Sequence, residues 1–331
     1  MKPLLLHYFI TTRCNARCSF CDIWKESSGP DAASPEVVVN LSSARKAGCR
    51  FVDFTGGEPL LHKELPLFLT HARRCGFISS VTTNCLLFPQ RAAELAGLVD
   101  LLHFSIDADT AELHDAMRGC PSYQKVVDSI DSALKNNLVP DLLYTYTERN
   151  IGAFEGIYQI AREKQLLIIL DPVFDVNGKD PLDPAIHRKA VALSKRPGVY
   201  LNRAHLTLRS RGGNRTMSPL CRAVDSTIVI MPDNTLALPC FHHRIDLIPV
   251  KNDLAGILNG AGRREALKMQ GQYQFCEQCH INCYFDPSYG FMRNRMFMQS
   301  MAAKFKYAWY KYMLYRRPAP VWHTRTGTHE Q

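Results

Sequence analysis

The chain has 331 residues, of which 46% are hydrophobic and 21% are charged. This length allows one large domain or two smaller ones, and the composition excludes a disordered or fibrous protein. The formal net charge is +9, but residues 287–331 hold eight Lys or Arg against one acidic residue, Glu330. The remainder of the chain is nearly neutral, so a protein that coats nucleic acid is not expected.

The 12 cysteines are too many for an ordinary enzyme and too few for a disulfide scaffold. The apolar start of the chain, residues 4–10, is too short for a secretory signal, and nowhere do 18 apolar residues follow one another. We therefore expect a protein of the reducing cytoplasm, where clustered cysteines bind metals more often than they form disulfides.

Strand-like apolar runs alternate with helix-like stretches through the first half, as in βα units around a parallel sheet. Strands are expected at 4–11, 51–55, 78–82, 101–106, 142–147 and 166–170. Helices are expected at 34–48, 65–75, 90–98, 123–136 and 154–164. Six such units form either an open doubly wound sheet or a full or partial barrel, and both place functional groups at the carboxyl ends of the strands.

The alternation of strand-like and helix-like stretches ends in a segment rich in Pro, Gly and Asp, residues 171–184. Two short apolar runs, 227–231 and 235–238, are joined by turn residues and predict a hairpin in a second unit. We expect four parts: a first domain, a connecting segment, a cysteine-rich unit, and a basic aromatic helix with a tail. Their predicted bounds are 1–180, 181–220, 221–285 and 286–331.

Three cysteines, Cys14, Cys18 and Cys21, follow the first strand with the spacing C-x3-C-x2-C. Three thiolates on one loop can bind three irons of a cubane cluster and leave the fourth iron open to a small molecule. Zinc would require a fourth ligand, and the nearest candidate, His7, lies back on the strand. The run resembles the signature of the radical S-adenosylmethionine (SAM) superfamily. The resemblance implies a [4Fe-4S] cluster on these cysteines, SAM on its open iron, and Phe20 near the adenine.

The second strand ends in two glycines, a glutamate and a proline, which resemble the Gly-Gly-Glu-Pro motif of the same family. Glycines allow close approach of the backbone, and a carboxylate can pair with an ammonium group. A plain turn between a strand and a helix is the alternative. The resemblance implies that the methionyl amino group of SAM is held by Gly56, Gly57, Glu58 and Pro59.

Polar residues also close the later strands. Asn84, Ser105 and Asp107 follow the third and fourth strands, where the family places side chains that contact the ribose, although Asp107 could equally cap the next helix. Residues 114–119 resemble a further stretch of these enzymes, in which Arg118 is either structural or faces the substrate. Asp171 closes the sixth strand and is a catalytic candidate, or simply precedes a proline in a turn.

A second cysteine group resembles the twitch domain, a shortened SPASM domain that binds an auxiliary [4Fe-4S] cluster. Four cysteines are also a standard structural zinc site, so zinc stays open here. Cys283 is a further ligand, a replacement for Cys276, or a free thiol. The resemblance predicts a partial (β/α)6 TIM-like barrel, a twitch/SPASM-like domain and a C-terminal basic helix. The cysteines of the second group are Cys221, Cys240, Cys276, Cys279 and Cys283.

The C-terminal segment 293–317 mixes seven Lys or Arg with aromatic residues. Helical spacing puts apolar side chains on one face and Lys304 and Lys311 on another. Such a helix is typical of contact with an anionic membrane surface, here the inner face of the membrane. The alternative is a helix packed on the protein with a solvated basic side. The apolar face comprises Met298, Met301, Phe305, Trp309 and Tyr312.

The resemblance implies an enzyme that cleaves SAM with an electron from a reduced flavodoxin- or ferredoxin-type donor. A 5′-deoxyadenosyl radical then abstracts hydrogen from a small, sugar-like or lipid-linked substrate, for oxidation or bond formation. The first strand begins near residue 4, so we expect no leader-binding domain before it. A peptide maturase with a separate leader-binding partner is one alternative, and a non-catalytic iron–sulfur or zinc module is another. Residues 56–59 distinguish the enzyme from the non-catalytic module, because an electron carrier needs no SAM pocket.

Overall fold

A computed structural model describes residues 2–175 and 182–315. The described residues form one sheet of ten strands in the order β10-β9-β8-β1-β2-β3-β4-β5-β6-β7, of which β1 to β7 are parallel. The parallel strands are β1 (Leu5–Thr11), β2 (Phe51–Gly56), β3 (Ile78–Thr83), β4 (Leu101–Ser105), β5 (Asp141–Tyr146), β6 (Ile168–Pro172) and β7 (Val199–Tyr200). The predicted partial barrel is confirmed.

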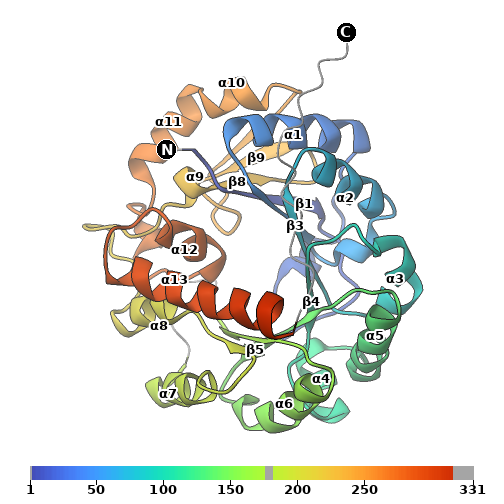
Figure 1. Ribbon diagram of the computed structural model, residues 1–331. Coiled ribbons are helices and arrows are strands. Elements are labelled where there is room, and N and C mark those ends of the chain that lie inside the picture. The colour runs from blue at the N-terminus through green and yellow to red at the C-terminus, as the bar shows by residue number, and fades with distance from the viewer. Residues whose placement is uncertain (1, 176–181, 316–331) are drawn as a thin grey trace.

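Helices cover the outer side of the strands, as Figure 1 shows for α1 to α6. Their apolar residues recur at helical spacing; α5, for example, buries Val126, Ile130 and Ala133 on one face. These helices are α1 (Ser34–Ala47), α2 (Leu65–Arg74), α3 (Phe88–Leu95), α4 (Ala111–Arg118), α5 (Tyr123–Lys135), α6 (Phe154–Glu163), α7 (Pro184–Leu193) and α8 (Arg203–Ser210). The six predicted βα units are present, whereas α4 and β7 were not predicted.

The predicted hairpin extends the barrel sheet. It comprises β8 (Thr227–Ile230) and β9 (Thr235–Leu238), followed by β10 (Asp246–Pro249). β8 pairs in parallel with β1, Leu5 opposite Thr227, so the cysteine-rich unit is joined to the barrel by a backbone ladder. Asn234 has a φ of 58° in the hairpin turn, which asparagine tolerates, and its side chain accepts a hydrogen bond from Asn40 at 2.8 Å.

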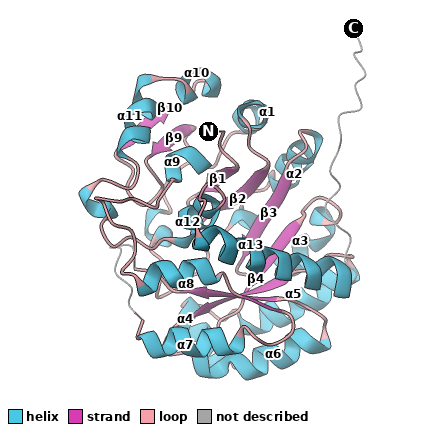
Figure 2. Cartoon of the chain, turned by 60° about the vertical axis from the view of Figure 1, so that its left-hand side comes forward, coloured by secondary structure: helices cyan, strands magenta, loops and turns pink. Residues whose placement is uncertain are grey.

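The remaining helices belong to the cysteine-rich unit and to the C-terminal segment. They are α9 (Ala223–Ser226), α10 (Leu254–Leu258), α11 (Ala261–Met269), α12 (Asn282–Tyr289), α13 (Arg295–Ala308) and a π-helix, η5 (Trp309–Leu314). In Figures 1 and 2, α13 crosses in front of the strands. Tyr307 of α13 packs edge-on against Tyr200 of β7, with 5.6 Å between ring centroids.

The basic face of the C-terminal helix turns inward, which differs from both sequence-based alternatives. Lys311 is buried and pairs with Asp141 at 2.7 Å, while Lys304 pairs with Asp286 at 3.0 Å. The residues exposed to solvent include the apolar Phe305. Arg316 and Arg317 of the predicted basic segment lie outside the described residues. No helix within the described ranges is long and apolar enough to cross a membrane.

Candidate active site

A cavity of about 550 Å³ lies at the carboxyl ends of the strands. One wall comes from the loop after β1, the floor from β2, β3, β5 and β6, and the other wall from the segment that follows β9. This is the end of a parallel barrel at which active sites form. The lining residues are Phe9, Phe20, Cys21, Asp22, Ile23, Glu26, Thr55, Gly56, Thr82, Thr145, Asp171, Pro172, Val173, Phe174, Phe241, His242 and Arg244.

The loop that carries Cys14, Cys18 and Cys21 is held against the end of α4. The backbone N–H groups of Arg17 and Ser19 donate to the carbonyls of Arg118 and Met117, each at 2.9 Å. All three thiols are partly buried. Burial raises the pKa of Cys14 to about 11, whereas a hydrogen bond from the Ala16 backbone lowers it. The loop therefore carries three partly buried thiols, of which Cys21 lines the cavity, and backbone N–H groups reach the sulfurs of Cys14 and Cys21.

Backbone hydrogen bonds connect the turn after β2 to the start of this loop. Gly57 N–H donates to the Thr11 carbonyl at 3.0 Å and Glu58 N–H to the Arg13 carbonyl at 2.8 Å. A Cβ atom on Gly57 would lie 2.0 Å from the Arg13 carbonyl oxygen, and one on Gly56 would lie 1.9 Å from that of Thr11. Only glycine permits this approach, so these two positions fix how the turn and the cysteine loop meet.

The Glu58 carboxylate is directed into the protein rather than into the cavity. It accepts hydrogen bonds from Thr83 Oγ1 and from the Asn84 N–H, each at 2.8 Å, and from the Leu60 N–H at 3.1 Å. Burial raises the pKa of Glu58 to about 7, and these hydrogen bonds oppose the rise. Glu58 thus links the end of β3 to the turn. Pro59 begins a short 3-10 helix, η2 (Pro59–Leu61), and is buried.

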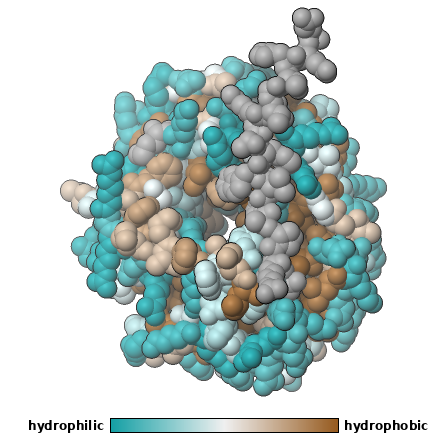
Figure 3. Space-filling model, in the orientation of Figure 1, coloured by the Kyte–Doolittle hydropathy of each residue, from teal (hydrophilic) through white to brown (hydrophobic). Residues whose placement is uncertain are grey.

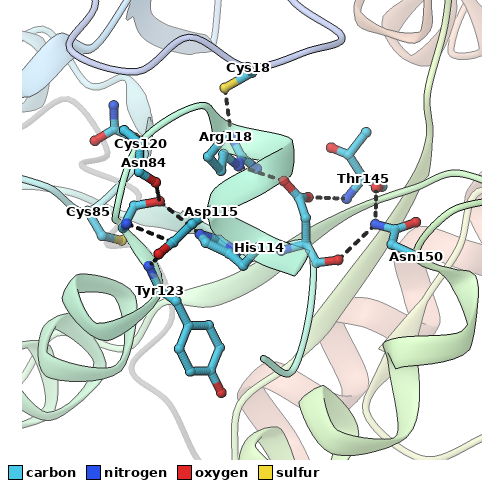
Figure 4. Close-up of polar contacts among 12 residues, drawn as sticks. Cys18, Asn84, Cys85, His114, Asp115, Arg118, Cys120, Tyr123, Thr145 and Asn150 are labelled. Atoms are coloured by element: carbon cyan, nitrogen blue, oxygen red, sulfur yellow. Dashed lines mark hydrogen bonds and ion pairs between the residues drawn. The ribbon is translucent and has the colours of Figure 1, made fainter. Parts of the chain in front are cut away.

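Asp107 is fully buried and does not line the cavity. Its carboxylate pairs with Arg118 Nε at 2.6 Å and accepts a hydrogen bond from the Thr145 N–H at 3.3 Å. Arg118 in turn places Nη1 3.7 Å from Cys18 Sγ, and Figure 4 shows its side chain directed toward that sulfur. The Asp107 carboxylate is therefore paired with Arg118, and Arg118 connects it to the cysteine loop.

Three further predicted residues differ in their access to the cavity. Asn84 donates to the Asn15 side chain at 2.8 Å, and Ser105 is buried at the end of β4; neither lines the cavity. Asp171 is on the wall, where it accepts a hydrogen bond from Asn282 Nδ2 at 2.8 Å. Burial raises the pKa of Asp171 to about 6, although the nearby positive charge of Arg209 lowers it.

Four cysteines of the second group come together around one small cavity of about 20 Å³. They arrive from four segments: the approach to α9, the end of β9, a 3-10 helix η4 (Gln274–Cys276) and the approach to α12. The cysteines that line this cavity are Cys221, Cys240, Cys276 and Cys279. Cys283 is not among the lining residues; its carbonyl oxygen lies 3.5 Å from His7 Nε2 on β1.

A buried asparagine, Asn214, organises this convergence. Its side chain donates to the carbonyls of Gly271 and Cys276 at 2.8 and 3.0 Å and accepts from the N–H of Cys221 at 3.2 Å. Its backbone N–H donates to the Cys279 carbonyl at 2.8 Å. One residue therefore contacts the backbone of three of the four cysteines. The sequence does not reveal this role, because Gly-Gly-Asn is an ordinary turn composition.

Both thiol sets are consistent with metal groups. Within residues 2–175 and 182–315, no three His, Cys, Asp or Glu side chains converge closely enough to hold a single metal ion. Three thiols beside an open cavity are the donor set of a cubane cluster with one accessible iron. The four thiols of the second group line one cavity, and by number and type they are a donor set used by a cluster or by zinc, although their spacing here does not close on a single ion; metal analysis is the measurement that separates the two.

The second wall of the cavity was not predicted either. Phe241 stacks on Phe9 with 4.1 Å between ring centroids. Arg244 pairs with Glu26 of the cysteine loop at 2.7 Å, although 218 residues separate them. Because these residues directly follow Cys240, the cavity lies between the two cysteine groups.

Comparison with known proteins agrees with this geometry. Residues 8–160 match the model of the Radical SAM superfamily. A probable GTP 3′,8-cyclase of Archaeoglobus fulgidus is 36% identical over 138 residues, 41% of this chain and 46% of the relative. The GTP 3′,8-cyclase of Clostridium acetobutylicum is 30% identical over 157 residues, 45% of this chain and 49% of the relative. The chain thus spans about half the length of the curated relatives it matches.

Two solved structures share the fold at low sequence identity. Streptococcus suis SuiB bound to the precursor peptide SuiA has a TM-score of 0.67 and 15% identity, covering 86% of this chain and 76% of SuiB. The enzyme anSMEcpe with bound AdoMet has a TM-score of 0.63 and 16% identity, covering 93% of both chains. Radical SAM proteins use a [4Fe-4S] cluster and SAM. The matched region 8–160 contains the three-cysteine loop and the Gly-Gly-Glu-Pro turn, so this part of the chain is similar to the radical SAM superfamily.

Proposed function

We propose that this chain reductively cleaves SAM at a [4Fe-4S] cluster held by Cys14, Cys18 and Cys21 and abstracts hydrogen from a substrate bound in the 550 Å³ cavity. One observation carries the proposal. Phe20 and Cys21 form one wall, and Phe241 and His242, which directly follow Cys240, form the other. A substrate in this space would contact residues adjoining both cysteine groups.

The cluster and SAM, when bound, would supply a 5′-deoxyadenosyl radical, and the protein would position it. Gly56 and Gly57 allow the turn to approach the cysteine loop, and Phe20 offers an aromatic face at the cavity wall. Glu58, Asn84, Ser105 and Asp107 are proposed to support this site, three of them through the hydrogen bonds and the ion pair described above.

Asp171 is the proposed residue that contacts the substrate. It lies on the cavity wall, and its raised pKa of about 6 would allow it to hold or release a proton near neutral pH.

The second cysteine group is proposed to hold an auxiliary [4Fe-4S] cluster in a twitch/SPASM-like unit over residues 221–285. Backbone hydrogen bonds reach the sulfurs of Cys221, Cys240, Cys276 and Cys279, as hydrogen bonds do in many iron–sulfur sites. Such a cluster could take an electron from a substrate radical, which supports oxidation or bond formation. The electron for SAM cleavage would come from a reduced flavodoxin- or ferredoxin-type donor.

The substrate is proposed to be small, sugar-like or lipid-linked. Pockets of about 300–1,000 Å³ suit one drug-sized ligand, and here a cavity of about 550 Å³ has to admit SAM as well. The relatives named GTP 3′,8-cyclase act on a nucleotide, whereas the SuiB structure contains a precursor peptide. A peptide maturase with a separate leader-binding partner is therefore the second candidate.

The test is formation of 5′-deoxyadenosine by anaerobically purified, reduced protein given SAM. Wild type should exceed a Cys18→Ala variant, while Cys49→Ala, a buried cysteine outside both groups, should behave as wild type. About eight irons per chain should fall to about four when Cys14, Cys18 and Cys21 become alanine. Equal formation of 5′-deoxyadenosine by wild type and Cys18→Ala would instead indicate a non-catalytic iron–sulfur or zinc module.

A cytoplasmic location with peripheral contact at the inner face of the membrane is also part of the proposal. The support is the outward apolar side of α13, where Met298 and Phe305 are exposed. Deleting residues 291–331 should abolish binding to anionic liposomes, and unchanged binding would contradict this contact.

A further inference from the structure

A second cavity, of about 400 Å³, lies between α7, β7, α8 and α13 and shares no lining residue with the candidate active site. Three cationic side chains line it: Lys195, Arg203 and Lys306. Its lining contains no Asp or Glu. The other lining residues are Ser194, Val199, Tyr200, Leu201, Gln299, Ala302 and Ala303.

These three cations lack the carboxylate partners that neighbouring basic residues have. Lys304 and Lys311, on either side of Lys306, each form an ion pair with an aspartate. In the part of the chain that the structure describes, no carboxylate pairs with Lys195, Arg203 or Lys306. Lys306 Nζ donates to the Ser194 carbonyl at 2.5 Å and lies 5.8 Å from the centre of the Tyr310 ring. Burial lowers the pKa of Lys306, and the charge of Arg203 lowers it further. Several cations around a hollow without an anion attract a negatively charged ligand.

An apolar surface adjoins the cavity on the same helix. Met298, Phe305 and Trp309 are 65%, 70% and 48% exposed. Met298 and Phe305 belong to α13 and Trp309 begins η5, which directly continues it, so spacings of seven and four residues place the three on one side. Figure 3 shows apolar surface over α13. Since Ala302 and Lys306 of this helix line the cavity, cationic and apolar groups lie next to each other, as a phospholipid headgroup and its acyl chains require.

We propose that this cavity binds a phosphate group, and that the exposed apolar residues beside it favour the headgroup of an anionic phospholipid as the source. Arg203 would offer its planar donor pair to the phosphate oxygens, and Lys195 and Lys306 would add two further charges. This proposal rests on the membrane contact proposed above and is independent of the proposed radical chemistry.

The experiment is binding of the full chain to phosphatidylglycerol vesicles, to phosphatidylcholine vesicles and to inorganic phosphate. The test variant is Arg203→Gln/Lys306→Gln. The matched control, Arg264→Gln/Lys268→Gln, also removes two positive charges, but from α11. Each cation at an anionic surface strengthens binding about fivefold, so the test variant should bind phosphatidylglycerol about 25-fold more weakly than wild type. The control removes the same charge at a place that does not line the cavity, so it should bind within about twofold of wild type.

Preference for phosphatidylglycerol over phosphatidylcholine, lost in the test variant alone, supports the lipid source. Binding of inorganic phosphate without binding to vesicles, again lost in the test variant alone, supports the same site with a soluble phosphate compound. Equal loss in test and control variants would overturn the proposal, and so would the absence of binding by wild type to both phosphatidylglycerol and phosphate. Thermal unfolding of each variant checks that the chain remains folded.

Discussion

Replacing Asn214 with aspartate should remove the metal group of the second cysteine site and leave that of the first. The substitution keeps the shape of the side chain but replaces its amide NH2 with an oxygen. That oxygen would face the carbonyls of Gly271 and Cys276, which now accept hydrogen bonds at 2.8 and 3.0 Å. An unsatisfied buried polar group costs about 1–3 kcal/mol, so two lost hydrogen bonds destabilise this region by about 2–6 kcal/mol.

The natural control is another buried asparagine with the same kind of bonds. Asn150 donates to the carbonyls of Asp107 and Thr145, each at 2.9 Å, but it contacts none of the cysteines. Asn150→Asp should therefore lower the melting temperature by a similar mechanism without selective loss of the second metal group.

The assay is iron, sulfide and zinc per chain after anaerobic purification, together with thermal unfolding. Asn214→Asp should lose the metal that remains in the triple alanine variant of Cys14, Cys18 and Cys21. The reasoning is refuted if Asn214→Asp keeps the full metal content. It is also refuted if Asn150→Asp loses the same metal to the same extent, because general destabilisation would then explain both.

Three further predictions follow from single contacts. Gly57→Ala should reduce SAM cleavage at least 100-fold, because its Cβ would lie 2.0 Å from the Arg13 carbonyl oxygen, whereas Gly152→Ala, with no atom within 4 Å, should not. Lys311→Met should lower the free energy of unfolding by about 3–5 kcal/mol, because it removes the ammonium partner of the buried Asp141 carboxylate and leaves the Tyr307 hydroxyl as its hydrogen-bond donor; Lys311→Met/Asp141→Asn should recover most of it in denaturant titrations. Folded Asp171 has a pKa raised by burial from 3.8 to about 6, so it binds protons more tightly than the unfolded chain and stability falls as pH rises between these values. In thermal unfolding, Asp171→Asn should lose less stability than wild type as pH rises across that range. Equal slopes of stability against pH for the two proteins would contradict the assignment.

The elements that sequence reasoning predicted are those with a local signal. Apolar runs and helical spacing predict the six βα units, because each signal lies within one element. β7 comprises only Val199 and Tyr200, so no periodicity can reveal it. The three-cysteine loop was visible because its ligands lie within eight residues of one another, whereas the bridge from Asp107 through Arg118 ends on Cys18, which is 100 positions from Arg118 in the sequence.

The direction of the C-terminal helix shows why composition alone misleads. A helix with lysines on one side and aromatic residues on the other was expected to expose its charges. Asp141 is the first residue of β5 and is buried at the end of the barrel. Its ion pair with Lys311 directs that lysine into the protein. The partner of Lys304, Asp286, belongs to α12. Since neither carboxylate is near these lysines in sequence, only the fold could show that the apolar residues face outward.

The relation between the two cysteine groups depends on one strand. Cys14 lies three residues beyond the end of β1, and Cys240 lies two residues beyond β9, whose partner β8 pairs with β1. A ladder of backbone hydrogen bonds, rather than a flexible linker, therefore sets the separation of the two groups. A site that places a reactive group against one bond of its substrate needs rigid supports of this kind. It follows that substitutions which weaken the β1–β8 pairing should impair the cavity even where both cysteine groups keep their ligands.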